Sequence, residues 1–300
     1  MFQLMNKPIR IGTRGSALAL WQARWVQAQL TSLGIKSELV PIQSGGDKQQ
    51  QQPLYELGVQ GIFTKELDTA LLAKEVDIAV HSMKDVPTQF PEGIVPFFIP
   101  ERGHYEDVFV PNSAYWEADD CVIATSSLRR AAQWKFKYPS HRIADIRGNV
   151  PTRLKKLSES THHGTIMARA GLERLEVLPV DSVVLDWMIP APAQGAILVT
   201  GLASNQKLKT SLKSLNHSET AFCVSQERAF LRTLEGGCTA PIGAIAHEID
   251  GKIAFKGCVT HKEGTNQLVF DAQFPINQEG IGQHAAEQLL KQGAKKLLDG

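Results

Sequence analysis

The sequence predicts two α/β domains followed by a small α+β domain. Short apolar segments alternate with segments of helical periodicity over the first two thirds of the 300 residues, and this alternation restarts after a Pro-rich stretch at 87–100. Beyond about residue 218, a long helical segment precedes two strand-like segments and a final helix. Alternating strands and helices are typical of mostly parallel sheets that helices cover.

The first α/β domain is predicted from its apolar spacing and its helix signals. The expected elements are a strand at 8–12, a helix that Ser16 caps and Gly34 ends, a strand at 35–42, a helix at 64–75 and a strand at 76–80. A Gly- and Gln-rich segment that runs to about residue 61 predicts a surface loop. We expect the chain to leave this domain near residue 100.

The same pattern predicts the other two domains. For the second we expect strands at 121–125, 143–146 and 165–168, helices at 128–137 and 152–158, and a turn or helix at 171–175. The segment 190–199 is expected to return to the first domain. For the third we expect a helix at 219–234, strands at 252–260 and 267–274, and a helix at 281–298. The predicted domains are 1–101 plus 194–217, 102–193, and 218–300.

Composition excludes several classes of protein. A net charge of +1 gives no support to non-specific binding of nucleic acid or membranes. The four cysteines (Cys121, Cys223, Cys238 and Cys258) form no CxxC pair and have no histidine at metal-ligand spacing, so we expect neither a disulfide framework nor a metal site. No export signal is recognised, and the apolar stretches are too short to span a bilayer. We therefore expect a cytoplasmic protein.

Basic and hydroxyl-bearing side chains follow five predicted strands, in the turns at 13–16, 81–85, 125–130, 147–150 and 169–171. Ligands of open α/β sheets bind outside the carboxyl ends of the strands. Helix N-termini there attract anions, and arginine matches carboxylates with paired donors. In any single turn, the arginine could simply be solvated or ion-paired and have no ligand. That explanation fits five such turns together poorly. The turns predict a site for a ligand with several carboxylates or phosphates.

Asp85 and Cys238 stand out from this pattern. Asp85 is a lone carboxylate among cations, so it could stabilise a cationic intermediate or move protons. An ion pair with Lys84, or a plain turn role, is the alternative.

Cys238 lies in the segment EGGCTAP, whose glycines and proline predict a tight loop. A loop cysteine can be a nucleophile or an attachment site, or it can be an inert small side chain.

Eight longer segments carry a more specific signal. In chain order they are IGTRGSALALWQA, FTKELDTALL, DIAVHSMKDVPT, ATSSLRRAAQ, DIRGNVPTRL, AGLERL, PAPAQGA and ERAFLRTLEGGCTAPIGA. In these segments, and in their order, the sequence resembles the porphobilinogen deaminase family over nearly the whole chain.

The resemblance implies an activity and a cofactor. It implies two domains that resemble periplasmic binding proteins around a cleft, plus the small third domain. It implies a monomeric transferase that joins four porphobilinogen units head to tail, with loss of ammonia, onto a dipyrromethane primer. One primer per chain would be bound by a thioether to Cys238. Hydrolysis would release hydroxymethylbilane, the linear tetrapyrrole precursor of haem.

The resemblance also assigns roles to residues. Asp85 would stabilise the cationic azafulvene that remains after ammonia leaves, and it would meet pyrrole N–H groups. Positions implied to bind the cofactor, beside Cys238, are Ser82, Lys84, Thr125, Ser126, Ser127, Arg129, Arg130 and Arg147. Positions implied to bind substrate are Arg14, Ser16, Gln22, Arg153, Arg174 and Gln194. Each pyrrole carries an acetate and a propionate, which these cationic and neutral donors suit.

Some positions depart from the family pattern, so a family member with impaired catalytic activity remains an alternative. Val59 and Gln60 stand where glycine and lysine are usual, and Glu106 stands where arginine is frequent. Ala17 replaces a common proline, and Pro151 lies where other residue types are usual.

Two other classes of protein remain as rivals. A binding protein for acidic solutes would share the arginines but would not need Asp85 or the Cys238 loop. An enzyme with a cysteine nucleophile should place a histidine beside Cys238. His217 and His247 are the nearest in sequence, and neither lies in a recognisable motif.

Overall fold

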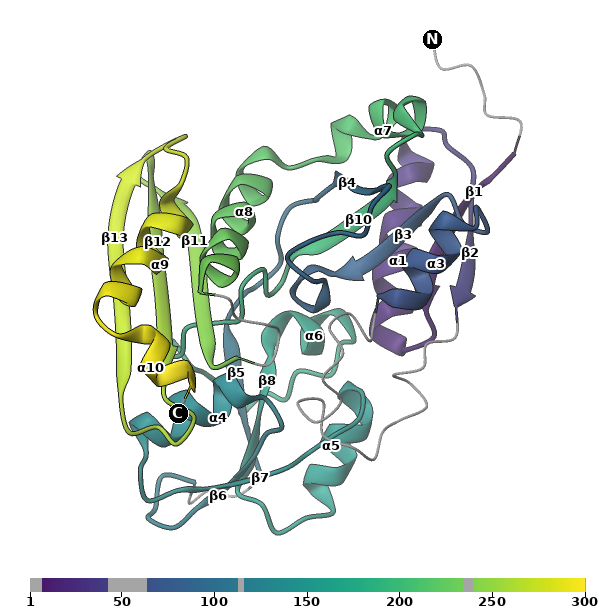
Figure 1. Cartoon of the computed structure of the whole chain (residues 1–300). Helices are drawn as coiled ribbons and strands as arrows, with labels where there is room; N and C mark the ends of the chain where they lie inside the picture. Colours follow the sequence, from purple (N-terminus) through teal and green to yellow (C-terminus); the bar gives the residue numbers. More distant parts are fainter. Residues whose placement is uncertain (1–6, 43–63, 113–115, 235–239, 300) are drawn as a thin grey trace. The chain divides into compact units, whose positions relative to one another are not determined.

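The computed structural model describes residues 7–42, 64–112, 116–234 and 240–299, which form two compact units (Figure 1). The first unit comprises the described residues within 1–51, 59–102 and 196–221. The second unit comprises those within 103–195 and 222–300. No helix in the described ranges is long and apolar enough to cross a membrane.

A five-stranded sheet with the order β2-β1-β3-β10-β4 organises the first unit. Its elements are β1 (Ile9–Arg14), α1 (Ala17–Ser32), β2 (Ser37–Ile42), α3 (Lys65–Leu72), β3 (Ile78–Ser82), the 3-10 turn η1 (Met83–Asp85), β4 (Ile94–Phe98), β10 (Ile197–Leu202), α7 (Gln206–Ser211) and the 3-10 turn η2 (Lys213–Leu215). β1 is parallel to β2 and β3, whereas β10 is antiparallel to both β3 and β4. β1, β2, β3 and β4 therefore run in one direction, and β10 runs in the opposite direction.

Helices cover both faces of this sheet. Ile78 and Val80 of β3 pack in the same cluster as Val26 and Leu30 of α1. Ala79, between them, packs with Leu67 and Leu71 of α3 on the other face. Because neither face meets water, β3 begins with the continuous apolar run 78–80 instead of alternating, and its polar residues His81 and Ser82 come only at its carboxyl end.

The second unit contains a sheet with the same arrangement, in the order β7-β6-β8-β5-β9. Its elements are β5 (Asp107–Pro111), β6 (Val122–Ala124), α4 (Leu128–Lys137), β7 (Arg142–Ala144), α5 (Val150–Ser158), β8 (Gly164–Ala168), α6 (Arg169–Arg174) and β9 (Val183–Val184). β5 is antiparallel to β8 and β9. Leu157 of α5 and Leu172 of α6 pack on one face, and Trp134 of α4 packs on the other.

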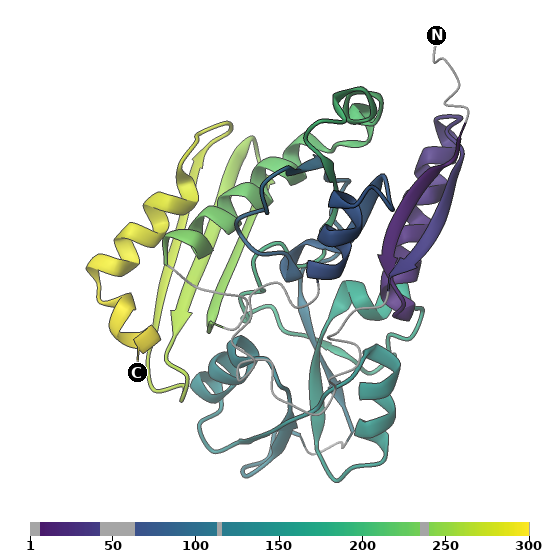
Figure 2. The same cartoon turned by 45° about the vertical axis from the view of Figure 1, so that its right-hand side comes forward.

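A three-stranded antiparallel sheet lies in the C-terminal part of the second unit (Figures 1 and 2). Its elements are α8 (Ser218–Thr233), β11 (Ile242–Ile249), β12 (Lys252–Thr260), β13 (Gln267–Pro275), α9 (Ile281–Lys291) and α10 (Ala294–Asp299). Phe230 of α8 and Leu289 of α9 pack with Phe255 of β12 in one cluster. Gly282 of α9 faces the Gln226 carbonyl of α8 so closely that a Cβ would clash with it. The two helices therefore cover the same face of the sheet.

The predicted fold class is confirmed, and several predicted elements need correction. Two α/β sheets, mostly parallel, precede an α+β part. The Pro-rich stretch contains β4, which the sequence did not indicate; Pro96 is tolerated because β4 lies at an edge of its sheet. β5, β9 and β11 were also missed. A single helix at 281–298 is wrong, because Gly293 has a φ of 98° and separates α9 from α10.

Candidate functional site

In the first unit, a small pocket lies at the carboxyl ends of β1 and β3. These strands are parallel neighbours, so the turns that follow them meet at one edge of the sheet. The pocket encloses about 90 Å³, and its lining includes Arg14, Ser16, Gln22, Ser82 and Asp85. The structure thus brings together five of the residues that the sequence assigned to cofactor, substrate or catalysis.

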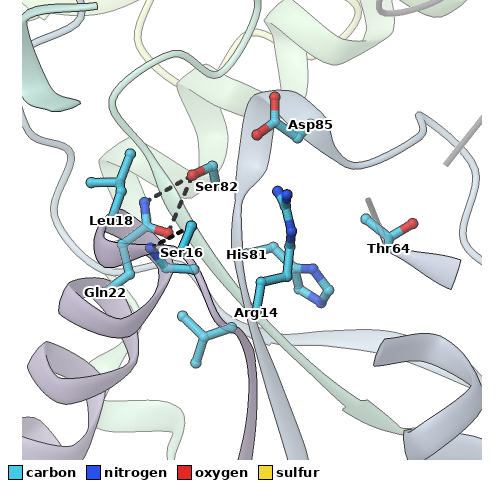
Figure 3. Close-up of a pocket in the computed structure, with 10 residues that line it drawn as sticks. Arg14, Ser16, Leu18, Gln22, Thr64, His81, Ser82 and Asp85 are labelled. Atoms are coloured by element: carbon cyan, nitrogen blue, oxygen red, sulfur yellow. Dashed lines mark hydrogen bonds between the residues drawn. The ribbon is translucent and has the colours of Figure 1, made fainter. Parts of the chain in front are cut away.

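Ser16 and Gln22 come from α1, whose N-terminus faces this pocket. The Ser16 side chain caps the helix by accepting a hydrogen bond from the Ala19 N–H at 3.3 Å. One turn later, the buried Gln22 donates from Nε2 to Ser82 Oγ at 2.9 Å (Figure 3). This bond fixes the Ser82 hydroxyl and joins α1 to the end of β3.

Asp85 ends the 3-10 turn that follows β3, and it lines the pocket with Arg14. In Figure 3 the Arg14 guanidinium extends toward the part of the pocket that Asp85 lines. Asp85 is half-buried, and no hydrogen bond or ion pair to its carboxylate is found within the described residues. A carboxylate so placed can accept N–H donors from a ligand. Lys84 is half-buried in the same turn.

His81 lines the same pocket but is neutral near pH 7. Burial, and secondarily the Arg14 charge, lower the pKa of His81 to about 4. Its Nε2 forms a hydrogen bond of 3.1 Å with Thr200 Oγ1 of β10. Sequence reasoning did not single out His81. His81 therefore adds no positive charge to the pocket at neutral pH.

In the second unit, turns that carry hydroxyl groups and arginine follow the parallel neighbours β6 and β7. Ser127 caps α4 by accepting from the Arg130 N–H at 3.4 Å, and Thr125 Oγ1 accepts from the Ser127 N–H at 3.2 Å. Ser126 Oγ donates to the Ile146 carbonyl at 2.9 Å and accepts its N–H at 3.1 Å. These bonds hold the two turns side by side.

The turn after β7 presents Arg147 at the start of α5. Asn149 caps this helix by accepting from the Thr152 N–H at 3.0 Å. Pro151 lies in the first helical turn, where its missing N–H costs nothing, so this departure leaves α5 intact. Arg153 Nε donates to the Gly148 carbonyl at 2.8 Å. Arg147 and Arg153 are both half-buried.

Arg129 and Arg130 are buried in α4, and both face one carboxylate. Arg129 Nη2 lies 2.7 Å from Asp107 Oδ2, and Arg130 Nη2 lies 2.8 Å from Asp107 Oδ1. Gln194 Nε2 donates to the same Oδ1 at 3.0 Å. Two guanidinium groups share one carboxylate, so this buried cluster carries an excess positive charge. Sequence reasoning missed Asp107; its only signal is an acidic residue that directly precedes the apolar run Val108–Val110.

Arg174 and Arg169 come from α6. Arg174 Nη2 donates to the Gly195 carbonyl at 2.6 Å, and burial lowers the pKa of Arg174 to about 10, so it remains charged at pH 7. Arg169 Nε contacts Glu173 Oε1 at 2.8 Å, and its Nη1 lies 3.6 Å from Glu106 Oε1. Glu106, which departs from the family pattern, therefore pairs with a cation of the fifth turn.

Cys238, Val59 and Gln60 lie outside the described residues. The other three cysteines are buried, and burial raises the pKa of the Cys258 thiol to about 11. These three are unreactive for that reason. No group of three or more His, Cys, Asp or Glu side chains that could hold a metal ion is found in the described ranges.

The profile described as "Porphobilinogen deaminase, dipyromethane cofactor binding domain" matches residues 9–210, and "Porphobilinogen deaminase, C-terminal domain" matches residues 221–291. The chain belongs to the porphobilinogen deaminase family. A porphobilinogen deaminase of Chlorobium limicola is 41% identical in an alignment of 308 positions that covers 98% of each chain.

Among solved structures, weaker similarity is found to transporter-associated binding proteins. One is the second substrate-binding domain of a putative amino acid ABC transporter from Streptococcus pneumoniae, with a TM-score of 0.43 and 11% identity over 75% of this chain and 94% of that one. Another is a periplasmic substrate-binding protein from Coxiella burnetii, with a TM-score of 0.43 and 12% identity over 73% of this chain and 96% of that one.

Replacement of Asp107 by Asn should destabilise the second unit strongly. It leaves two buried guanidinium groups without their counter-charge, which costs about 3–5 kcal/mol. Glu263→Gln is the matched control, because its ion pair with Lys135 is exposed and is worth at most about 1 kcal/mol. Urea unfolding of the two variants measures the difference, and equal losses of stability would contradict a structural role for Asp107.

The buried His81 should make stability fall with acid. Its pKa is lowered in the folded protein, so the unfolded chain takes up the proton first as pH drops below about 6.5. Stability is therefore lost between pH 6.5 and 4, by at most about 3 kcal/mol at the lower end. His81→Gln should flatten this part of the pH profile of unfolding, whereas replacement of the exposed His284 by Gln should not. An unchanged slope in His81→Gln would refute the assignment.

Proposed function

We propose that this protein is a hydroxymethylbilane synthase. It condenses four porphobilinogen units head to tail, with loss of ammonia, onto a dipyrromethane held by Cys238, and it releases hydroxymethylbilane by hydrolysis. Family membership supports this activity over the whole chain. The observation that carries the mechanism is the pocket where Asp85 and Arg14 line one wall beside the N-terminus of α1.

The donor set of the second unit suits dipyrromethane. Each ring of this group carries an acetate and a propionate, so it needs several cationic and neutral donors. Arg129 and Arg130 outnumber the carboxylate of Asp107, and a ligand carboxylate would balance the remaining charge. The N-termini of α4 and α5 add N–H donors beside Ser126 and Arg147. We assign these residues, with Thr125 and Ser127, to cofactor binding, together with Ser82 and Lys84 of the first unit.

Arg14 and Ser16 are proposed to bind the carboxylates of the incoming substrate. The N-terminus of the 16-residue α1 carries the positive end of its dipole, and Arg14 adds a full charge before it. The bond from Gln22 to Ser82 holds these donors in place before substrate arrives. Arg153 and Arg174 complete the substrate set. Gln194, which the resemblance assigned to substrate, is fully buried, so we propose that it acts by positioning Asp107.

Asp85 is proposed as the catalytic carboxylate. When the C–N bond of the aminomethyl group breaks, the electron pair leaves with ammonia and a positive charge spreads over the pyrrole. A carboxylate that accepts the pyrrole N–H stabilises that charge as it develops. His81 is neutral and buried, so it does not compete as a cation. The same carboxylate can then take the proton lost when the new ring regains aromaticity.

Bound dipyrromethane would supply the nucleophilic pyrrole carbon for the first substrate, and each later unit would join the pyrrole added before it. The role of Cys238 is to keep this group bound, which makes each addition effectively intramolecular. The buried, high-pKa thiol of Cys258 is a poor alternative for attachment.

Further features of the protein are proposed on weaker support. We propose three domains with the boundaries predicted from the sequence, and the three separate sheets of the described residues support this division. Three buried cysteines that form no disulfide within the described residues support a reducing compartment such as the cytoplasm. The net charge of +1 gives nucleic acid no attraction. A monomer is the state that the family resemblance implies.

Impaired activity is the second candidate, because of Gln60 and Glu106. The ion pair between Glu106 and Arg169 favours full activity, since it gives the substituted carboxylate a local partner. Gln60 lies outside the described residues, so its effect on activity is tested by the assays and mass measurements below.

Asp85→Ala should reduce turnover at least about a hundredfold, because the developing cation loses its stabilising carboxylate. The melting temperature should stay unchanged, since Asp85 makes no bond within the described residues. The exposed Glu92→Ala is the control and should keep full activity. Steady-state assays with porphobilinogen measure the loss. An active Asp85→Ala enzyme would remove the role assigned to Asp85.

The intact mass should exceed the chain mass by two pyrrole units, localised to the Cys238 peptide, and porphobilinogen should add further steps. Cys238→Ser should abolish the stable adduct, whereas Cys223→Ala should retain it because that thiol is buried in α8. A bare chain mass that porphobilinogen cannot change would indicate an impaired relative and direct attention to Gln60. A normal adduct in Cys238→Ser would refute the attachment site.

A further inference from the structure

A second cavity lies within the second unit. It encloses about 360 Å³ between the segment 184–190 and the C-terminal sheet. From that sheet it is lined by Ile245 and His247 of β11 and by Ala254 and Lys256 of β12, among others. We call it the C-terminal cavity. Its lining includes none of the residues to which catalytic, cofactor or substrate roles are assigned above.

The walls of the C-terminal cavity are mainly apolar. Met188, Ile189 and Pro190 form one side and are buried, and Ile245 faces them from β11. Ala244 and Ala246, on either side of Ile245, pack instead with α8 and α9 on the other face of the sheet. The volume and the apolar lining are typical of sites that hold a small organic molecule.

Two buried polar atoms in this lining lack partners. Glu106 Oε2 and His247 Nδ1 are buried and have no hydrogen-bond partner among the described residues. Such atoms are rare, because an unsatisfied buried polar group is costly. Arg169 approaches Glu106 only at the other oxygen, at 3.6 Å. A rotation of the Glu106 side chain, which is about a quarter exposed, would bring Oε2 to the cavity, where a ligand N–H donor would satisfy it.

The charges around the C-terminal cavity favour a ligand with a positive charge. Glu106, Asp186 and Asp271 contribute three carboxylates, against two cations: Lys256 in the lining, 3.4 Å from Asp271, and Arg169 behind it, 3.6 Å from Glu106. The excess is negative, so a polycarboxylate such as porphobilinogen is repelled and a cation is attracted. The Tyr105 and His247 rings, stacked with centroids 6.1 Å apart, add flat aromatic surface.

We propose that the C-terminal cavity is a second ligand site, which takes a small organic cation with a flat apolar body and N–H donors, such as an aromatic amidine. The apolar walls hold the body, Glu106 accepts the N–H groups, and the carboxylates at the mouth favour the positive charge. Ile189 connects this site to α4, because its carbonyl accepts hydrogen bonds from Arg129 at 2.8 Å and from Gln133 at 2.9 Å.

Benzamidine is the probe, and its neutral analogue benzamide is the control. In the full-length holoenzyme labelled at the methionine methyl groups with ¹³C, Met188 reports on the C-terminal cavity and Met83 reports on the first unit. Benzamidine should shift the Met188 resonance in a saturable way and leave Met83 unchanged. Benzamide should bind at least tenfold more weakly. Equal binding of the two compounds, or no shift at Met188, overturns the proposal.

Variants test which groups bind the cation. Glu106→Gln and Asp186→Asn should each weaken benzamidine binding at least threefold and leave benzamide binding unchanged. Ala254→Leu should abolish binding of both compounds by filling the cavity. Glu263→Gln removes a distant carboxylate and should have no effect. Asp186 is exposed, so Asp186→Asn remains informative if a buried variant fails to fold, and unaltered benzamidine affinity in Asp186→Asn and Glu106→Gln overturns the proposal.

Discussion

The carboxylate of Asp107 is the constraint on which the second unit depends. It is fully buried at the start of β5 and is shared by Arg129, Arg130 and Gln194. Without it, two buried guanidinium charges would lack their counter-charge. Arg130 also donates to the Ile166 carbonyl of β8 at 2.9 Å, so the same cluster fixes α4 against the sheet. The position of the α4 N-terminus, and hence of the turn at Thr125–Ser127, follows from this ion pair.

The sequence predicted the local features of the site better than its long-range contacts. Ser16 and Ser127 were placed correctly at helix starts, because a cap depends on neighbouring residues alone. The arginines of α4 were identified, but their burial was not, since Asp107 lies more than twenty residues away in a strand that no pattern indicated. β4 escaped detection because Pro96 interrupts it, and β5 because Asp107 and Pro111 leave only three apolar residues between them. The role of His81 was missed because its burial depends on β10, which follows it by more than a hundred residues.

The two α/β sheets share one strand order but not one chemistry. β1 and β3 of the first unit correspond by position to β6 and β8 of the second. The turns after β1 and β6 both present hydroxyl groups at a helix N-terminus. The turn after β3 ends in Asp85, whereas β8 is followed by Arg169, which two glutamates pair with. The same framework therefore ends this strand in a carboxylate in the first unit and in an arginine in the second, which suits the proposed division between catalysis and cofactor binding.

The insertion of β10 between β3 and β4 has a consequence for synthesis on the ribosome. β10 comprises residues 197–202, so the first sheet cannot close until about two thirds of the chain has been translated. At about 5–20 residues per second, β3 and β4 wait for roughly 5–20 s after β4 has been made. During this interval their unpaired edges are open to other chains. The strands of the second sheet are contiguous from β5 to β9, so the middle of the nascent chain can fold before its beginning.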